Sequence, residues 1–555
     1  MVHSILNKVL LLLLNASFCS CFKIHSFSQQ PLSGRIQVQY EAASNRLKPL
    51  KSQNILEELR ELDPTTLETI WERVLDTVED ASLHIRRKFL TKLTRPELET
   101  KKEDVPRVVV LGFGWGAHAI SKVVDTDACD VVFVSPRNYF LFTPMLASTA
   151  VGTVEYRSIT EPARKANPVA EYYEGSCVDV LPEKQEIIIE SSSRISNKAK
   201  ERLTVPYDYL VWAVGTKTGT FGTPGAKENC FFIKEIEDCV GLRRAIVDSF
   251  EKASLPKTSE EEMKRLLTFA IVGGGPTGVE FTAELVDFLK NDLPAYYPLL
   301  IDYVSVKLIQ AGDTILPVFD ASLQKKGMEQ LTSNQFVEIL LNTKVAEVQE
   351  EKMIFTNGNE LQYGVAVWAA GTESRNITKL LISKIEEQAS APETKRGDVL
   401  VDDWLRVKGT NGTILAIGDC ATMESGRLPA TGQVAAQQGA FVGRLLNRGY
   451  DITATPPRID QKEDPIKSAW IDLRGYTEAK PFRFLNLGLL AYVGDRKALA
   501  QVQTGDSTWA RAYGEVGFLL WRSVYVVKQV STRNRILVLF DRLKSKLFGR
   551  DITRL

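Results

Sequence analysis

Two stretches of the chain share one pattern of apolar and polar positions. The runs "RVVVL" at 107–111 and "LLTFAIV" at 266–272 each lead through a glycine-rich loop into a helix-forming stretch. A short β-branched run bounded by glycine predicts a buried strand, and helical spacing after the loop predicts a helix. The chain therefore contains two strand–loop–helix units, at 107–135 and 266–285.

Three further apolar runs indicate how the two units are connected. The stretches "YDYLVWAVGT" (207–216) and "YGVAVWAAGT" (363–372) are paired apolar strands that end in Gly-Thr, and "GTILAIGDCA" (412–421) is a strand that ends in Gly418-Asp419. This order predicts that the second unit is inserted into the first. We expect an α/β fold with two Rossmann-type dinucleotide-binding domains and a C-terminal amphipathic region that anchors the protein at a membrane.

The segments expected from this order cover the whole chain. They are a targeting peptide (1–50), a helical extension and linker (51–104), the first part of an FAD-binding domain (105–235), an NAD(P)H-binding domain (236–375), the second part of the FAD-binding domain (376–450) and a region for membrane association and dimerisation (451–555). Residues 52–93 carry helical spacing interrupted at Asp63-Pro64, which predicts two helices.

The glycine loops carry the first chemistry. They read Gly112-x-Gly114-x-x-Ala117 and Gly273-x-Gly275-x-x-Gly278. The first glycine permits a tight turn, the second lets backbone N–H groups approach a pyrophosphate, and the small third residue lets the helix pack on the strand. The N-terminus of the helix then attracts the phosphates. One such loop can be a simple turn, but two in the same context indicate two nucleotides, most economically a flavin and a nicotinamide.

Composition excludes several other functions. Lys plus Arg equals Asp plus Glu, at 69 each, so no overall charge favours nucleic acid. The seven cysteines form no CxxC pair, which argues against a disulfide scaffold, a zinc site or a disulfide reductase. With only four histidines, two of them in the first 25 residues, a histidine-based metal site or triad is not expected. We therefore predict no metal.

The first 40 residues contain no acid and combine a short apolar run with a basic, Ser-rich stretch. This pattern is typical of a targeting peptide. A mitochondrial presequence and a plastid signal reached through the secretory route both fit, and so does a leader without function.

The blocks "SPRNYFLFTPMLASTAVGTVEYRSITEPAR" (135–164), "GGGPTGVEFTAEL" (273–285), "AIGDCA" and "GQVAAQQG" (432–439) resemble the type II NADH:quinone oxidoreductases, the alternative NADH dehydrogenases that pump no protons. The resemblance runs from about Val105 to the C-terminus and is closest to the mitochondrial, matrix-facing kind. It implies electron transfer from NADH or NADPH through FAD to a membrane quinone, ubiquinone first. The alternatives are a flavoprotein reductase with a soluble acceptor and a nucleotide-binding redox sensor.

The resemblance also implies roles for individual residues. FAD would lie on Gly112, Gly114, Ala117, Arg137 and Asp419, and NAD(P)H on Gly273, Gly275 and Gly278. Glu280 matches a family glutamate beside the nicotinamide, where it could position the ring or supply a proton. The other interpretation of Glu280 is an acid that favours the first turn of its helix.

Gln433 and Gln437 lie four residues apart, as a similar pair does in the quinone channel of the family. The chain departs from the family at Gly432, where an alanine is usual, and this glycine should loosen the start of the helix. A glutamine pair on a solvated helical face is the alternative.

Residues 514–550 alternate short apolar clusters with basic residues. Between Val516 and Arg550, eight Lys or Arg stand against one acid, Asp541, and no apolar run exceeds five residues. We expect an amphipathic helical pair with Trp521, Tyr525 and Phe540 facing a membrane surface, so that the protein is peripheral on the matrix side of the inner mitochondrial membrane or in a plastid. A helical pair within a homodimer interface is the alternative, and both can hold.

Gln310 ends the strand "VSVKLIQ", where an acid usually binds the adenosine ribose of the nicotinamide cofactor. An acid there repels the 2′-phosphate of NADPH, whereas an amide does not. Two interpretations fit: Gln310 allows NADPH to bind, or it forms hydrogen bonds with the ribose hydroxyls of NADH, which is then the donor.

Overall fold

The structure is a computed structural model, and it describes residues 64–90, 105–192, 201–459, 477–504 and 507–553. The expected targeting peptide lies outside the described residues. So does the first of the two expected helices, the one that precedes Pro64. The second of these helices is α3 (Pro64–Leu90), whose described residues start at the proline.

The first sheet contains seven strands within the described residues. Its order is β19-β8-β1-β2-β5-β6-β7, and the strands are β1 (Arg107–Leu111), β2 (Asp130–Ser135), β5 (Glu171–Leu181), β6 (Glu186–Ser191), β7 (Arg202–Pro206), β8 (Tyr209–Trp212) and β19 (Ile414–Ala416). From β19 to β5 neighbouring strands are parallel, whereas β6 and β7 add an antiparallel edge. The β-branched side chains of β1 are buried because helices cover the parallel strands.

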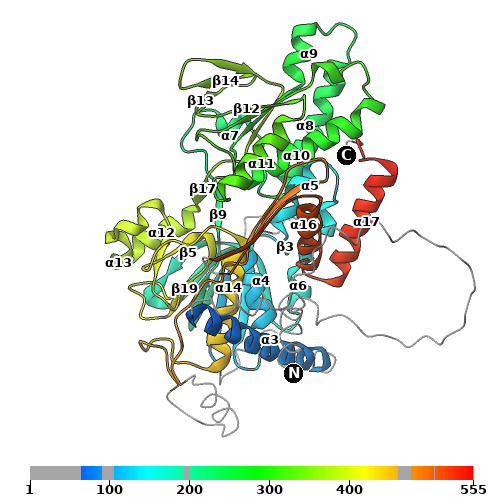
Figure 1. Cartoon of the computed structure of the whole chain (residues 1–555). Coiled ribbons are helices and arrows are strands. Elements are labelled where there is room, and N and C mark those ends of the chain that lie inside the picture. Colours follow the sequence, from blue (N-terminus) through cyan, green and yellow to red (C-terminus); the bar gives the residue numbers. More distant parts are fainter. Residues whose placement is uncertain (1–63, 91–104, 193–200, 460–476, 505–506, 554–555) are drawn as a thin grey trace, which may run out of the picture.

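The second sheet is smaller and parallel. Its order is β12-β11-β10-β16, from β10 (Thr268–Val272), β11 (Ser305–Ile309), β12 (Val337–Leu340) and β16 (Val365–Trp368). The antiparallel strands β13 (Val345–Val348), β14 (Lys352–Phe355) and β15 (Glu360–Gln362) lie beside it (Figure 1). The two Rossmann-type units of the expected fold class are confirmed by these two sheets.

The chain passes between the two sheets through a short ribbon. Strand β9 (Thr216–Thr218) leaves the first sheet and pairs antiparallel with β17 (Thr372–Ser374), through which the chain returns. Strand β19 then joins the first sheet beside β8, although about 200 residues separate the two in the chain. Smaller pairs are formed by β3 (Tyr139–Leu141) with β4 (Thr160–Pro162) and by β18 (Val399–Val401) with β20 (Ala421–Met423).

Helices cover both sheets, and a third sheet precedes the last helices. The helices that follow α3 are α4 (Trp115–Val123), α5 (Leu146–Ala150), α6 (Ala163–Ala166), α7 (Ala226–Asn229), α8 (Ile236–Ala253), α9 (Glu260–Leu266), α10 (Pro276–Asn291), α11 (Ala321–Thr332), α12 (Asn376–Lys384), α13 (Glu386–Ser390), α14 (Gly432–Arg448), α16 (Glu515–Val527) and α17 (Thr532–Phe548). The third sheet is an antiparallel meander of β21 (Gly488–Tyr492), β22 (Ala498–Thr504) and β23 (Ser507–Gly514).

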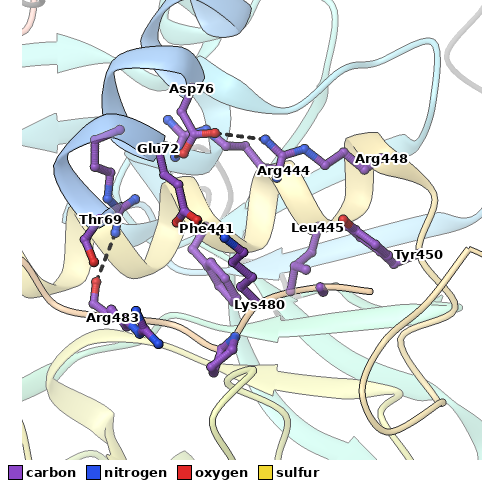
Figure 2. Close-up of a pocket in the computed structure, with 13 residues that line it drawn as sticks. Thr69, Glu72, Asp76, Phe441, Arg444, Leu445, Arg448, Tyr450, Lys480 and Arg483 are labelled. Atoms are coloured by element: carbon purple, nitrogen blue, oxygen red, sulfur yellow. Dashed lines mark hydrogen bonds and ion pairs between the residues drawn. The ribbon is translucent and has the colours of Figure 1, made fainter. Parts of the chain in front are cut away.

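Helix α3 is held on α14 by ion pairs. Arg444 contacts Asp76 at 3.1 Å and Asp80 at 2.6 Å, and Arg448 contacts Asp76 at 2.9 Å and Glu79 at 3.0 Å. Figure 2 shows Asp76, Arg444 and Arg448 between the two helices, around a small pocket that Lys480 and Arg483 also line. Lys480 extends the network to Glu68 and Glu72 of α3, at 2.6 and 2.5 Å.

Candidate functional site

The first glycine loop connects β1 to α4 in a conformation that requires glycine. Gly112 has φ +98°, and a Cβ there would come 2.4 Å from the carbonyl oxygen of Ala213. Gly114 is the N-cap of α4, and a Cβ built on it would meet no atom within 4 Å. Ala117 is fully buried in the first turns of α4. The loop therefore packs tightly at its first glycine and is open at its second, where the N-terminus of α4 can receive an anion.

A cavity of about 850 Å³ begins at this loop and extends to the second unit. Its volume is in the usual range for cofactor sites, ~300–1,000 Å³. The lining includes Gly112, Gly114, Arg137 and Asp419 from the first unit, Thr277 and Glu280 from α10, and Tyr525 from α16. Four of the residues expected to hold FAD and the glutamate expected beside the nicotinamide thus border one space.

Arg137 and Asp419 lie in this cavity with partners of opposite charge or with hydroxyls. Arg137 forms an ion pair with Glu235, which is the N-cap of α8. The Asp419 carboxylate accepts a hydrogen bond from the Thr216 hydroxyl at 3.4 Å, and the Lys234 ammonium lies 3.9 Å from it. These residues come from four separate segments of the chain, which only the fold brings together.

Helix α14 closes against α4 through glycines. A Cβ on Gly439 would come 2.1 Å from the carbonyl oxygen of Gly116, so the two helices touch backbone to backbone. Gln438, only 2% exposed, accepts a hydrogen bond from the Gly418 backbone N–H at 2.7 Å through its Oε1. Sequence reasoning missed Gln438, whose one signal was its place next to the expected quinone pair.

The departure from the family at Gly432 has a packing reason. A Cβ on Gly432 would lie 2.7 Å from the indole ring of Trp115. The start of α14 is not loosened as expected, because the Thr431 hydroxyl accepts a hydrogen bond from Val434 N and caps the helix. Gly432 therefore leaves room for the Trp115 ring.

The two glutamines expected at the quinone differ in their partners. Gln437 is engaged by the backbone of Leu485: its Nε2 donates to Leu485 O at 2.8 Å and its Oε1 accepts from Leu485 N at 3.0 Å. The Nε2 of Gln433 is buried and has no hydrogen-bond partner among the described residues. Gln433 therefore keeps a free donor, whereas the Gln437 amide fixes the segment that precedes β21.

The second glycine loop repeats the geometry of the first. Gly273 has φ +117°, and a Cβ on Gly278 would come 1.9 Å from the Gly273 carbonyl oxygen. Gly275 is the N-cap of α10, and a Cβ built on it would meet nothing within 4 Å. The third glycine thus lets α10 pack on the loop, and the second leaves its approach open.

Gln310 is tied to this loop. Its Oε1 accepts a hydrogen bond from Gly274 N at 2.9 Å, and its Nε2 donates to Thr314 O at 3.0 Å. Lys307 points elsewhere and pairs with Glu338 of β12. An amide carries two N–H donors, so one remains for a ligand at the strand end. An acid could make the first of these bonds but not the second.

Glu280 lies at the inner end of the cavity and is 8% exposed. Its Oε1 accepts hydrogen bonds from Tyr492 N and from Trp521 Nε1, both at 3.2 Å. Burial raises the pKa of Glu280 to about 8, and the two donors only partly offset that effect. The Glu280 carboxyl is therefore mostly protonated at neutral pH and can donate a proton.

The C-terminal helices differ from expectation in the direction of two aromatic side chains. Trp521 is 2% exposed and stacks on Tyr492, and Tyr525 lines the cavity, so both point inward. Phe540 is 60% exposed, as expected. No helix in the described part of the chain is long and apolar enough to cross a membrane.

The outer faces of α16 and α17 nevertheless expose many apolar side chains. We call them the C-terminal apolar patch: Val516, Leu519, Leu520, Ile536, Leu539, Phe540, Leu543, Leu547 and Phe548. The α17 members recur every three or four residues and so form one stripe along that helix. Exposed basic side chains at Arg522, Arg533 and Lys546 adjoin the patch.

Two families match this chain. Residues 106–439 match the pyridine nucleotide-disulphide oxidoreductases, and residues 486–551 match the NDH2 C-terminal domain. The two matches contain both glycine loops, the first half of α14, and all of α16 and α17, whereas α3 lies outside them.

Among similar proteins, "External NADH-ubiquinone oxidoreductase 2, mitochondrial" of Saccharomyces cerevisiae is 39% identical over 80% of this chain and 81% of its own length. "Probable NADH dehydrogenase" of Dictyostelium discoideum is 34% identical over 85% of this chain and 96% of its own. "External alternative NAD(P)H-ubiquinone oxidoreductase B2, mitochondrial" of Arabidopsis thaliana is 34% identical over 82% of this chain and 90% of its own.

The solved structure of NDH2 from Plasmodium falciparum in complex with NADH superposes with a TM-score of 0.70 at 25% identity, covering 81% of this chain and 99% of that one. Identity above 30% over most of the length of several relatives agrees with this structural match. The chain belongs to the pyridine nucleotide-disulphide oxidoreductases and, within them, to the type II NADH dehydrogenases.

Proposed function

We propose that the protein oxidises NADH or NADPH with a bound FAD and passes the electrons to a membrane quinone, ubiquinone first. One observation carries this proposal: a single cavity is lined by the first glycine loop, by the start of α10 and by Tyr525 of α16. A flavin in that cavity would lie between a nicotinamide site at α10 and an acceptor site toward the C-terminal helices. The relatives named NADH- or NAD(P)H-ubiquinone oxidoreductases support the same assignment.

The residues around the cavity fit FAD. The open Gly114 and the start of α4 suit a pyrophosphate, and Arg137 adds a positive charge. Asp419, just after β19, suits the hydroxyls of the ribityl chain, because a carboxylate accepts hydrogen bonds from hydroxyl donors. When bound, FAD supplies the chemistry of accepting a hydride and releasing electrons to a second substrate. The protein orients the substrates, excludes water and supplies a proton.

NAD(P)H would lie on the second glycine loop, with its pyrophosphate at Gly275 and the N-terminus of α10. The Gln310 amide would face the adenosine ribose with its remaining N–H. This donor can serve a ribose hydroxyl or a 2′-phosphate oxygen, and the residue carries no charge to repel either cofactor. We therefore propose that both NADH and NADPH are electron donors.

The quinone would be recognised by a hydrogen bond from Gln433. A quinone carbonyl is an acceptor only, and the buried Nε2 of Gln433 is a donor that lacks a partner. A buried unpaired N–H costs roughly 1–3 kcal/mol, which a ligand carbonyl would recover. Glu280, protonated at neutral pH, would deliver a proton into the cavity that it lines, which Gly432 borders but Gln433 does not.

We propose that the C-terminal apolar patch rests on a lipid bilayer and thereby opens the site to a membrane-dissolved quinone. Apolar side chains next to Arg522, Arg533 and Lys546 suit an anionic membrane surface, where each basic residue contributes about 1 kcal/mol. The alternative is that a second copy of the chain covers this patch, and the test must distinguish a dimer interface from membrane binding.

Mitochondrial proteins are prominent among the relatives, so we propose a peripheral location on the inner mitochondrial membrane. The matrix side stays a prediction, because several of these relatives are named external. A plastid remains the alternative location.

The test uses the purified, flavin-loaded protein under anaerobic conditions. NADH or NADPH should bleach the flavin absorbance, and a short-chain ubiquinone should restore it with quinol formed in equal amount. Ferricyanide serves as the soluble acceptor for comparison. Flavin that is bleached and reoxidised by ferricyanide alone would reject the quinone and favour a reductase with a soluble acceptor. Absence of bleaching with either donor would favour a nucleotide-binding sensor.

A further inference from the structure

Helix α10 carries a line of buried carboxyl groups that begins at the cavity. Glu280, Glu284 and Asp287 follow one another at intervals of four and three residues and are 8, 4 and 6% exposed. Side chains at these intervals are neighbours on one helical face, with Cβ atoms about 5–6 Å apart. The line therefore spans about 10 Å of the helix. Three buried acids on one face are costly, and folding alone does not require them.

The inner end of the line is Glu280. Its carboxyl accepts hydrogen bonds from the backbone N–H of Tyr492 and the indole N–H of Trp521, and the Tyr525 phenol of α16 is a titratable group beside it. No lysine or arginine forms an ion pair with Glu280 among the described residues. The acid therefore keeps its proton at neutral pH, facing the cavity.

The middle of the line is Glu284. Its two oxygens accept hydrogen bonds from the hydroxyls of Ser148 at 2.6 Å and Thr153 at 2.8 Å. Arg550 lies 3.6 Å from the carboxylate and donates to the Thr153 hydroxyl at 2.9 Å. Arg542 of α17 is the other cation that faces Glu284. Hydroxyls both donate and accept, so they can pass a proton on.

The outer end of the line is Asp287. It accepts hydrogen bonds from the Tyr492 hydroxyl and, at 3.1 Å, from the backbone N–H of Asp495. Burial raises the pKa of Asp287 to about 6, so this carboxyl gains and loses a proton near neutral pH. Asp495 itself is partly exposed and pairs with Lys290 at 3.0 Å, which places this end of the line next to solvent.

Tyr492 links the two ends of the line. Its backbone N–H is bonded to Glu280 and its hydroxyl to Asp287, so the ring lies along α10. No group of three or more Cys, His, Asp or Glu side chains in the described segments is arranged to hold a metal ion.

We propose that Asp287, Glu284 and Glu280 form a proton path along α10, which brings one proton from solvent to the cavity for each quinone reduced. The path rests on the proposed function, whose balance is NAD(P)H + H⁺ + quinone giving NAD(P)⁺ + quinol. The donor supplies two electrons and one hydrogen as hydride, and the quinol needs a second hydrogen. Glu280 gives its proton into the cavity, and the next proton passes from Asp287 along the line, beside the Glu284 carboxylate, to Glu280. Asp287 then takes a proton from solvent.

The first test needs no turnover. The carbonyl stretch of the protonated Glu280 carboxyl is identified in the infrared spectrum as the band lost in Glu280→Gln. After rapid mixing with D₂O, this band shifts as the proton exchanges. In Asp287→Asn, which keeps an acceptor for the Tyr492 hydroxyl but has no acidic proton, the exchange should slow by about tenfold or more. Tyr492→Phe is a second variant, for the case that Asp287→Asn does not fold.

The matched control is Asp292→Asn. Asp292 is a buried acid at the same end of α10, but it pairs with Arg550 at 2.5 Å and does not contact Tyr492. This variant should lower the melting temperature without slowing the exchange of the Glu280 proton. Equal slowing in Asp287→Asn and Asp292→Asn would overturn the path in favour of a general effect of charge or stability, and so would unchanged exchange in Asp287→Asn.

The second test separates the path from the proposed function. In Asp287→Asn, bleaching of the flavin by NADH should stay at the wild-type rate, whereas quinol formation should fall about tenfold and recover on addition of imidazole as a small diffusible acid. Wild type that forms no quinol rejects the proposed function. Equal rates of quinol formation in wild type and Asp287→Asn would reject the proton path.

Discussion

Gly432 lies against the indole ring of Trp115 so closely that a Cβ on residue 432 would come 2.7 Å from the ring. Trp115 follows the second glycine of the first loop, and Gly432 is the first residue of α14. The indole N–H of Trp115 donates to the Thr143 hydroxyl at 3.0 Å, and its ring packs on Phe140 and Phe142. The ring therefore cannot move aside without loss.

Gly432→Ala should consequently weaken flavin retention. Overpacking of this kind costs about 1–3 kcal/mol, and the displaced Trp115 ring borders the cavity. The measurement is the midpoint of flavin release on heating, followed by flavin fluorescence. Trp115→Phe in the same chain should restore part of the loss, because the smaller ring gives space to the methyl group. A Gly432→Ala protein that releases flavin as wild type does would show that the ring adjusts freely.

Gln310→Glu should favour NADH over NADPH. A carboxylate at this position repels the 2′-phosphate, and a repulsion of 1.4 kcal/mol lowers kcat/KM for NADPH by about tenfold. The second carboxylate oxygen would also face Thr314 O, where the amide now donates, so some loss of stability is expected for both donors. Steady-state kinetics with each donor give the ratio, and thermal unfolding of the same samples gives the shared loss. An unchanged ratio would place the adenosine ribose elsewhere.

The stability of the protein should fall as pH rises from about 5 to 8. The pKa of Glu280 is raised from 4.5 to about 8 by burial, so the folded protein binds a proton that the unfolded chain has already lost in that range. Each pH unit in this window removes up to about 1.4 kcal/mol. Glu280→Gln should make the melting temperature independent of this acid between pH 5 and 8. Asp287→Asn should do the same between about pH 4 and 6, because the pKa of Asp287 is also raised by folding. Parallel pH profiles in wild type and Glu280→Gln would mean that Glu280 is ionised when folded.

Arg444→Met should destabilise the protein by about 3–5 kcal/mol, because it removes the buried cation that pairs with two acids of α3. Asp76 keeps its pair with Arg448, whereas Asp80 loses the guanidinium that lies 2.6 Å from it. The control is Lys408→Met, which removes an exposed pair with Glu424 and should cost less than about 1 kcal/mol. Urea unfolding measures both changes. Neutralising Asp76 and Asp80 together with Arg444 should recover most of the loss, since no uncompensated charge then remains. Equal effects of Arg444→Met and Lys408→Met would show that α3 is not held by these pairs.

Phe540→Glu together with Leu547→Glu should abolish binding to vesicles that contain anionic lipid, because both residues belong to the C-terminal apolar patch. Leu299→Glu is the matched control, since Leu299 is 86% exposed in the nicotinamide unit and lies outside the patch. Cosedimentation measures binding, and light scattering of the free protein reports its mass. If the double variant binds vesicles as before but loses a dimer, the patch covers a second copy instead of lipid.

The sequence by itself determined the fold class, because each glycine loop is fixed locally by the strand before it and the helix after it. It also indicated the insertion of one unit into the other; in the structure, β9 pairs with β17 and β19 pairs with β8. Gly112, Gly114, Gly273, Gly275 and Gly278 were recognised from spacing alone, since their backbone conformations are set within the loop.

Only the tertiary structure decided which side chains line the same cavity and which groups they form hydrogen bonds with. Gln310 and Gln437 are bonded to backbone groups whose positions no local pattern reveals, and Trp521 turns inward because Glu280 and Tyr492 lie beneath it. The spacing of Glu284 and Asp287 was visible in the sequence, but their burial depends on strands and helices more than a hundred residues away. Local periodicity specifies elements, whereas burial, and with it the pKa of a carboxyl, is a property of the packed chain.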